Sequence, residues 1–190
     1  MFNIIVVILQ KNSLVTVPVI QDGDFVLPGS HAIIVYLVRE YGGEDNPLYP
    51  NEPKIQAQVN QRLFFDSGIF YPAFKNQYNP YIYHTIEKTK ETEDKMHESL
   101  MFLENVLKES TWTAGDSMTV ADFSLVASIS TLQVLGVDLE MYDFINEWFI
   151  RCSKIMCEYE RANQVGIDLT RTLLKYSREA SEDLNDIYSL

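Results

Sequence analysis

Residues 115–123 read Gly-Asp-Ser-Met-Thr-Val-Ala-Asp-Phe, and an apolar run follows them as far as Val137. Thr119 and Asp122 have the spacing of a capping box, in which each side chain binds the backbone N–H of the other residue at the start of a helix. Because the apolar run begins directly after this box, the segment predicts the capped N-terminus of a long core helix.

The neighbouring residues indicate where this helix lies. Asp122 is the only charged residue between Asp116 and Asp138, and a helix that is apolar nearly all round lies in the middle of a helical domain. A single buried carboxylate is tolerated there only when it is hydrogen-bonded. Met118 and Phe123 stand at the two positions that a hydrophobic staple brings together, so we expect their side chains to meet.

The composition is that of a globular protein with an acidic excess. The chain of 190 residues is 46% hydrophobic and 12% aromatic, which is enough to bury a core as one domain or as two small adjoining ones. Its net charge of −12 argues against nucleic acid and anionic membranes as partners, because both would repel it. The acidity gives no clue to a substrate.

The cysteines and histidines favour neither a disulfide nor a metal site. Cys152 and Cys157 stand in a helical pattern at a spacing that points them to different faces, so we expect no internal disulfide. Free thiols are usual in a reducing compartment, and we expect a cytoplasmic protein. His84 and His97 have no cysteine or paired carboxylate at ligand spacing, so we expect no bound metal.

The first part of the chain has the pattern of short strands. Phe2–Leu9 is almost wholly apolar, but it is too short to cross a membrane and lacks the basic leader and cleavage site of a signal peptide. Most of its residues are β-branched, so we predict a buried strand. Two further strands are expected at Val17–Ile20 and Asp24–Leu27, joined by a hairpin turn that contains Gly23.

Helices are expected in the rest of the chain. Ser30 is predicted to cap the first one, which stops at Gly42-Gly43. The buried stripe of that helix should comprise Ile33, Tyr36, Leu37 and Tyr41. Glu44–Pro53, rich in proline and asparagine, has the composition of a linker. Helices should then cover Ile55–Phe70, Lys88–Leu107 with Met96, Leu100, Leu103 and Leu107 inward, the capped segment, Tyr142–Cys157 and Glu160–Tyr176, before an acidic tail at 179–186.

Four segments resemble one known family in unbroken order. They read Val17-Pro18, Phe25-Val26-Leu27-x-x-Ser30-His31-Ala32-Ile33-x-x-Tyr36-Leu37, Leu48-Tyr49-Pro50 leading to Val59-Asn60-Gln61-Arg62-Leu63-x-Phe65-Asp66, and Gly115-Asp116-x-Met118-Thr119-x-Ala121-Asp122. From about Asn12 to about Gly166 the chain resembles the cytosolic glutathione transferases, and among them the insect delta and epsilon classes. The resemblance implies an α+β fold, with a shortened thioredoxin-like domain at 1–45 and an all-helical domain at 46–190.

The resemblance also implies a glutathione site. In the family, the proline that matches Pro18 is cis and turns the preceding backbone, here that of Val17, toward the cysteinyl group of glutathione. From the residues alone, a trans proline at a sheet edge is the better expectation. The residue that matches Ser30 binds the γ-glutamyl carboxylate, although a serine at this position can also serve only as a helix cap. Gly29 and His31 flank this serine and belong to the same implied site.

Two other sets of residues have alternative interpretations. Arg62 and Asp66 are one helical turn apart, which is typical of a surface ion pair, while the resemblance places them near the two-fold axis of a homodimer. A dense set of aromatic residues is typical of a hydrophobic core. The resemblance instead implies that these residues form the wall of a pocket for small hydrophobic electrophiles, and we expect some of them in the core and some in the pocket. This set comprises Tyr71, Phe74, Tyr78, Tyr81 and Tyr83.

The chemistry implied by the family requires a glutathione thiolate. A free thiol with a pKa of about 8.5 is only a few per cent ionised at neutral pH, so the site must stabilise the anion. In the delta and epsilon classes a serine at the start of the first helix does so. Between Met1 and Val17 there is room for a strand and a loop but not for that helix. We therefore expect the serine to be absent and assign no catalytic residue.

Further departures from the family concern the binding of glutathione. Val15 stands where the family has a histidine for the glycyl carboxylate, and Gly29 stands where it has a glutamate for the γ-glutamyl amine. Ser13, Tyr71 and Tyr78 could be proposed as substitute hydroxyl donors, but nothing in their spacing favours this.

Three functions remain open. The first is a glutathione transferase that conjugates glutathione to hydrophobic electrophiles, a detoxifying reaction, with weak or lost activity. The second is a non-catalytic homologue that binds small hydrophobic molecules. The third is a dimeric interaction protein in which neither site is open.

Overall fold

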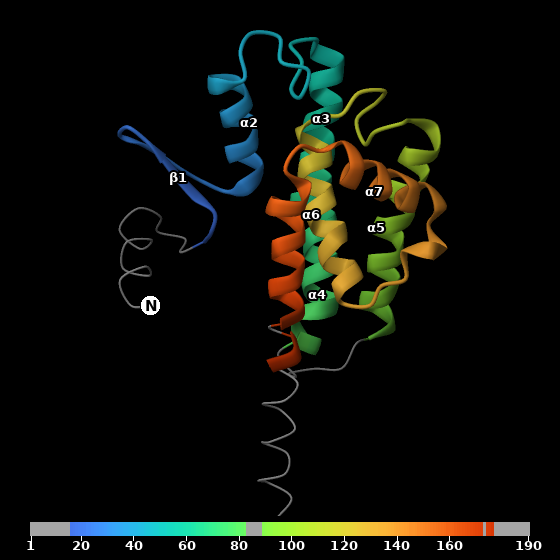
Figure 1. Cartoon of the computed structure of the whole chain (residues 1–190). Helices are drawn as coiled ribbons and strands as arrows, with labels where there is room; N and C mark the ends of the chain where they lie inside the picture. Colours follow the sequence, from blue (N-terminus) through green and yellow to red (C-terminus); the bar gives the residue numbers. More distant parts are fainter. Residues whose placement is uncertain (1–15, 83–88, 173, 177–190) are drawn as a thin grey trace, which may run out of the picture.

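The computed structural model describes residues 16–82, 89–172 and 174–176. A hairpin and one helix, α2, lie on one side of a bundle of helices (Figure 1). The strand expected at Phe2–Leu9 lies outside the described residues, and so do Ser13, Val15, Tyr83, His84 and the acidic tail.

The hairpin consists of β1 (Val19–Asp22) and β2 (Phe25–Pro28), which pair antiparallel. Gly23 has a φ of 56° in the turn between them, a conformation that glycine adopts without steric cost. Both strands lie later in the chain than predicted: β1 is shifted by two residues, toward the turn, and β2 by one residue, away from it. Gln21 and Asp22 therefore belong to the ladder.

The helix that follows, α2 (Ser30–Tyr41), begins one residue earlier than predicted. Gly29 occupies the capping position with φ 93° and ψ 115°, and no side chain caps the helix. The prediction that Ser30 is the cap is therefore wrong. Only glycine adopts such a φ without strain, so the chain turns from the strand into the helix at Gly29, and Ser30 becomes the first helical residue.

The predicted buried stripe of α2 is only partly correct. Ile33 is buried, but Leu37 and Tyr41 are 42% and 64% exposed. The helix packs on the bundle through a neighbouring stripe that comprises Ile34, Val35 and Val38. The reason is that the tyrosines of α2 face the hairpin and not the bundle.

Asp22 holds the hairpin against α2. Its carboxylate accepts hydrogen bonds from the Tyr36 hydroxyl, at 2.7 Å, and from the Tyr41 hydroxyl. These two bonds lower the pKa of the Asp22 carboxyl, and the same contact raises the pKa of Tyr36 to about 12. The rings of Phe25 and Tyr36 also pack at 5.2 Å between centroids.

The bundle begins with one continuous helical run. It comprises α3 (Pro53–Phe65), a π-helical turn η1 (Asp66–Phe70) and α4 (Tyr71–Ile82). Its start is capped by Glu52, whose carboxylate accepts from the Ile55 N–H at 2.7 Å. The predicted helix ended at Phe70, but the π-turn absorbs an extra residue without breaking the helix.

The later helices lie close to their predicted positions. They are α5 (Lys90–Glu109), α6 (Val120–Val134) and α7 (Asp143–Ile155), with the short turns η2 (Leu139–Met141) and η3 (Glu160–Gln164) and helical residues at 165–172 and 174–176. The inward positions predicted for α5, namely Met96, Leu100, Leu103 and Leu107, are all buried.

Helix α6 lies in the middle of the bundle, as its sequence, free of charges apart from Asp122, predicts (Figure 1). Leu125 and Ile129 are fully buried and join Trp148 of α7 and Leu103 of α5 in the larger core cluster. The first turn of α6 belongs to a second core cluster, which also contains side chains of α3 and against which side chains of α2 pack. One helix therefore carries both cores.

The capping box forms at the start of α6. Asp122 Oδ2 accepts from the Thr119 N–H at 2.8 Å, and Oδ1 accepts from Trp148 Nε1 and from both the N–H and the hydroxyl of Thr113, each at 2.9 Å. Met118 and Phe123, the two residues of the expected hydrophobic staple, have different surroundings. Met118 packs on the larger core cluster, whereas Phe123 is 37% exposed and lines a cleft.

Both cysteines are free, with Cys152 buried and Cys157 exposed. Burial raises the pKa of the Cys152 thiol, so this thiol is poorly reactive. Among the described residues, no helix is long and apolar enough to pass through a lipid bilayer.

The capping box generates a stability prediction. Thr119→Ala should lower the free energy of unfolding by about 1 kcal/mol, the usual cost of losing a helix cap. Asp122→Ala should lower it by at least about 3 kcal/mol, because several buried donors lose their acceptor. Denaturant unfolding of each variant measures these changes. Asp116→Ala removes an exposed carboxylate beside the same turn and should change stability by less than about 0.5 kcal/mol. Equal losses for Asp116→Ala and Asp122→Ala would contradict the prediction.

Candidate functional site

A cleft of about 570 Å³ lies where α2 meets η1, α4 and α6. It brings together four of the residues predicted for the glutathione site, Val17, Gly29, Ser30 and His31. The complete lining is Thr16, Val17, Gly29, Ser30, His31, Ile34, Asp66, Ser67, Tyr71, Phe123, Ser124, Ala127 and Ser128.

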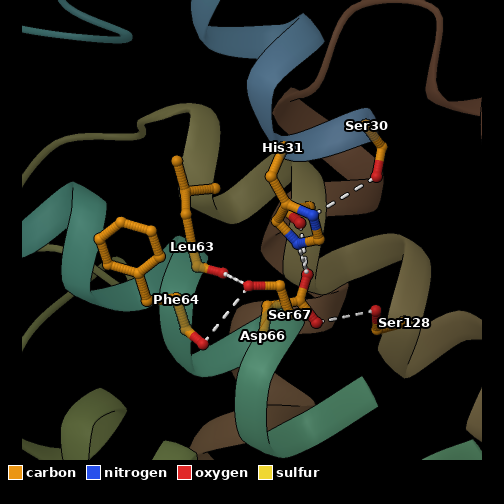
Figure 2. A network of polar contacts seen from close by, with 8 residues as sticks. Ser30, His31, Leu63, Phe64, Asp66, Ser67 and Ser128 are labelled. Carbon is orange, nitrogen blue, oxygen red and sulfur yellow. Dashed lines mark hydrogen bonds and ion pairs between the residues drawn. The ribbon is translucent and has the colours of Figure 1, made fainter. Parts of the chain in front are cut away.

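A buried carboxylate organises the inner end of this cleft. Asp66 is only 2% exposed. Its Oδ2 lies 3.0 Å from His31 Nε2, and its Oδ1 accepts from the Ser128 hydroxyl at 3.1 Å (Figure 2). Oδ2 also accepts from the Ser124 hydroxyl. A buried carboxylate is tolerated only with such donors. The network therefore ties α2 to the central helix α6.

The predicted surface ion pair between Arg62 and Asp66 is wrong. The Arg62 Nε donates to the Thr113 carbonyl at 2.6 Å, and its guanidinium carbon lies 5.3 Å from the centre of the Phe102 ring. Burial lowers the pKa of Arg62. Asp66 turns to the other side because the cleft offers it three donors, whereas an exposed ion pair is worth only a few tenths of a kcal/mol. Their proposed place at a dimer axis stays a prediction.

Sequence reasoning missed the serines of α6. Ser124 and Ser128 stand four residues apart in a largely apolar helix, which places both on one face. That face meets Asp66 of η1. Two polar residues in register on a buried helix are a signal that a polar partner lies opposite, so this pair could have been found.

The N-terminus of α2 opens into the cleft. The first N–H groups of any helix lack intrahelical acceptors, and no side chain caps α2. The positive end of the helix dipole adds to the attraction for an anion. Ser30, with its hydroxyl 3.5 Å from His31 Nδ1, stands at this end. The arrangement can bind a carboxylate.

The peptide bond between Val17 and Pro18 is cis, as the family resemblance implies and in contrast to the trans form that the residues alone favour. Val17 is 73% exposed and lines the cleft. The Pro18 carbonyl accepts from the Gly29 N–H at 3.1 Å. This bond holds the Val17 segment beside the start of α2.

The outer wall of the cleft is apolar. Tyr71 and Phe123 are 50% and 37% exposed and line it. Phe74, also predicted for this wall, packs on the helical core, with its ring centre 5.8 Å from that of Tyr71. Tyr78 and Tyr81 lie on α4, but their side chains fall outside the described part. The pocket role of these four residues stays a prediction.

No metal centre can be assembled from the residues that the structure describes. His97 Nδ1 lies 2.7 Å from the Tyr142 hydroxyl, and no group of three or more His, Cys, Asp and Glu side chains in the described ranges could hold an ion.

Comparison with known proteins identifies the family. Residues 6–45 match the model of the glutathione S-transferase N-terminal domain, and residues 68–155 match that of the C-terminal domain. Glutathione S-transferase 1 of Manduca sexta is 41% identical over 162 residues, which span 84% of this chain and 73% of that protein.

Solved structures agree with this match. A delta-class glutathione transferase of Nilaparvata lugens superposes with a TM-score of 0.84 at 36% identity, over 89% of this chain and 79% of the other. An epsilon-class glutathione S-transferase of Musca domestica superposes with a TM-score of 0.80 at 31% identity, over 89% and 78%. The chain has the glutathione transferase fold, a thioredoxin-like N-terminal part with a helical C-terminal part, and it belongs to the glutathione S-transferase family.

Proposed function

We propose that this protein binds glutathione in the cleft and conjugates it, at a low rate, to small hydrophobic electrophiles, a detoxifying role in the cytoplasm. The observation that carries this proposal is the uncapped start of α2. There Ser30 and His31 stand beside a cis Val17-Pro18 peptide and are held in place by the buried Asp66.

Each part of glutathione has a matching surface in this arrangement. The γ-glutamyl carboxylate would bind at the N-terminus of α2 with the Ser30 hydroxyl, because helix starts attract anions. The exposed backbone at Val17 would receive the cysteinyl group, as the family resemblance implies. The apolar wall with Tyr71 and Phe123 lies in the same cleft and would receive the electrophile.

The low rate follows from missing polar groups. Gly29 has no carboxylate for the γ-glutamyl ammonium, and Val15 cannot bind the glycyl carboxylate as a histidine would. These two positions would hold glutathione less firmly, and the loss of one preorganised polar contact typically costs about a hundredfold to a thousandfold in rate.

The alternative function is binding of hydrophobic ligands without catalysis. The apolar wall supports it, because Tyr71 and Phe123 are accessible and do not depend on any glutathione contact. In that case small apolar molecules would be ligands and not substrates.

A second copy of this chain is the proposed protein partner. The face of α3 and α5 near Arg62 presents the exposed apolar side chains Phe64, at 72%, and Phe102, at 37%. Ile69, 56% exposed in η1, extends this patch. Such a patch favours an interface. The Asp66 carboxylate is buried inside its own chain, so its proposed place near the two-fold axis does not require a direct contact with the second copy.

A thermal melt in millimolar glutathione tests the proposed function. For a weak site, glutathione at a concentration equal to its dissociation constant should raise the melting temperature by only about 1 to 2 °C. Conjugation of a model aryl halide should be slow. A shift of roughly 5 to 10 °C, which needs a hundredfold excess over the dissociation constant, would show that the site is intact. No shift at all, with an apolar fluorescent probe still bound, would favour the ligand-binding alternative.

Gly29→Glu tests the missing contact directly. A β-carbon at Gly29 meets no atom within 4 Å, so the new carboxylate can extend into the cleft. The positive φ should cost about 1 to 3 kcal/mol of stability, but the melting shift in glutathione should increase several-fold. Gly29→Ala is the matched control, because it has the same backbone strain and no carboxylate. If both variants respond alike to glutathione, the contact is not the limiting one.

The dimer proposal predicts a mass of about twice 21.9 kDa in light scattering at micromolar concentration. Phe64→Asp should shift the protein toward the monomer, because it places a charge in the apolar patch. Leu169→Asp changes another side chain that is 61% exposed and is not among the residues of the patch, and it should leave the mass unchanged. A wild-type monomer at this concentration would rule out a stable dimer.

A further inference from the structure

The cleft contains a serine, a histidine and an aspartate in series. The Ser30 hydroxyl lies 3.5 Å from His31 Nδ1, and His31 Nε2 lies 3.0 Å from Asp66 Oδ2 (Figure 2). We infer that this cleft also hydrolyses small carboxylic esters, with Ser30 as the nucleophile, His31 as the general base and Asp66 as a positioning residue. This activity goes beyond the proposed glutathione transfer and needs no glutathione.

Asp66 determines which nitrogen of His31 can act as a base. A carboxylate only accepts hydrogen bonds, so Nε2 must carry the proton that it donates to Asp66 Oδ2. The other nitrogen, Nδ1, is then left with a free lone pair, and it is the one that faces Ser30. The hydroxyls of Ser124 and Ser128 bind the same carboxylate and prevent it from turning away.

The backbone places Ser30 as a nucleophile requires. Ser30 is the first residue of a helix and is separated from the preceding strand by a single turn residue. Strand β2 ends at Pro28, Gly29 has a φ of 93°, and α2 begins at Ser30. A sharp turn from strand to helix exposes a serine hydroxyl in other hydrolases. The first N–H groups of α2, which no side chain caps, can stabilise the negative charge that develops on the ester oxygen.

The distance from Ser30 to His31 is compatible with this role. A working nucleophile and its base come within about 2.6 to 3.2 Å, and this contact is often longer before substrate binds. Ser30 is the first residue of its helix and exposed, so rotation of its side chain can shorten the contact. His31 cannot move as freely, because Asp66 holds it.

The reaction balances without a cofactor. The Ser30 oxygen bonds to the ester carbon as its proton moves to His31 Nδ1. The bond from that carbon to the leaving oxygen then breaks, and this oxygen takes the proton from His31. Water attacks the acyl-serine in the same way, gives a proton to His31, and releases the carboxylic acid as Ser30 recovers its hydrogen.

The walls of the cleft indicate the kind of ester. Tyr71 and Phe123 provide exposed aromatic surface beside Ser30, which suits a flat aryl leaving group. A cleft of about 570 Å³ has room for a short acyl chain with such a group. The substrate class is therefore aryl esters of short carboxylic acids.

Hydrolysis of 4-nitrophenyl acetate without glutathione tests this inference. The wild type should release many nitrophenolate molecules per chain, which excludes simple acetylation of surface groups. Ser30→Ala should lower the turnover rate to the background of the buffer. Ser153→Ala is the matched control, because it removes an exposed helical serine on α7 and should retain full activity.

Asp66→Asn tests whether Asp66 positions His31 for catalysis or only stabilises the fold. An asparagine amide can donate to Nε2 and so leave the proton on Nδ1, which then cannot take a proton from Ser30. The kcat should fall by about a hundredfold or more, while KM stays within about twofold. A thermal melt confirms that the variant is folded. If Asp66→Asn fails to fold, a fluorophosphonate probe followed by peptide mapping replaces it, and the label should lie on Ser30 of the wild type.

Some outcomes would overturn the inference. They are turnover that survives Ser30→Ala, a fluorophosphonate label on another residue, or no turnover above buffer in the wild type. Glutathione binding is a separate question, because the ester assay contains no glutathione. Failure of the melting shift with retained hydrolysis would refute only the proposed function, and the reverse result would refute only this inference.

Discussion

The structure depends first on the carboxylate of Asp122. It accepts hydrogen bonds from the backbone and side chain of Thr113, from the Thr119 N–H and from the indole of Trp148, so one buried charge joins the loop before α6, the first turn of α6 and the helix α7. These donors have no water to replace the carboxylate if it is lost. The direction in which α6 enters the bundle, and with it the place of both core clusters, follows from this network.

A second buried carboxylate, that of Asp66, joins the elements that form the cleft. Asp66 opens a π-helical turn and accepts hydrogen bonds from Ser124 and Ser128 of α6. Through His31 it also reaches α2. The helix that organises the bundle therefore also positions the part of the chain that carries the candidate site. Packing and function share one element, which explains why polar residues are tolerated on so apolar a helix.

The cleft combines two kinds of surface. One end presents unpaired backbone N–H groups and the Ser30 hydroxyl, and the other presents the aromatic rings of Tyr71 and Phe123. The first suits an anion and the second an apolar group. Such a pair of surfaces fits the proposed reaction between glutathione and a hydrophobic molecule, and also the proposed cleavage of an aryl ester. The identity of Gly29 weakens the first use, because glycine provides the turn but no charged contact.

The local structure could be predicted from the amino-acid sequence, because capping, periodicity and turn chemistry act between residues close in the chain. Thr119 and Asp122, the inward face of α5 and the hairpin around Gly23 could all be predicted, and the motifs around Ser30 identified the family. Contacts between side chains of different elements could be seen only in the folded chain. Asp66 bonds to α2 and α6 and not to Arg62, because burial of a charge depends on hydrogen-bond donors from distant segments. The buried stripe of α2 also differs from the predicted one, because the tyrosines of this helix contact the hairpin.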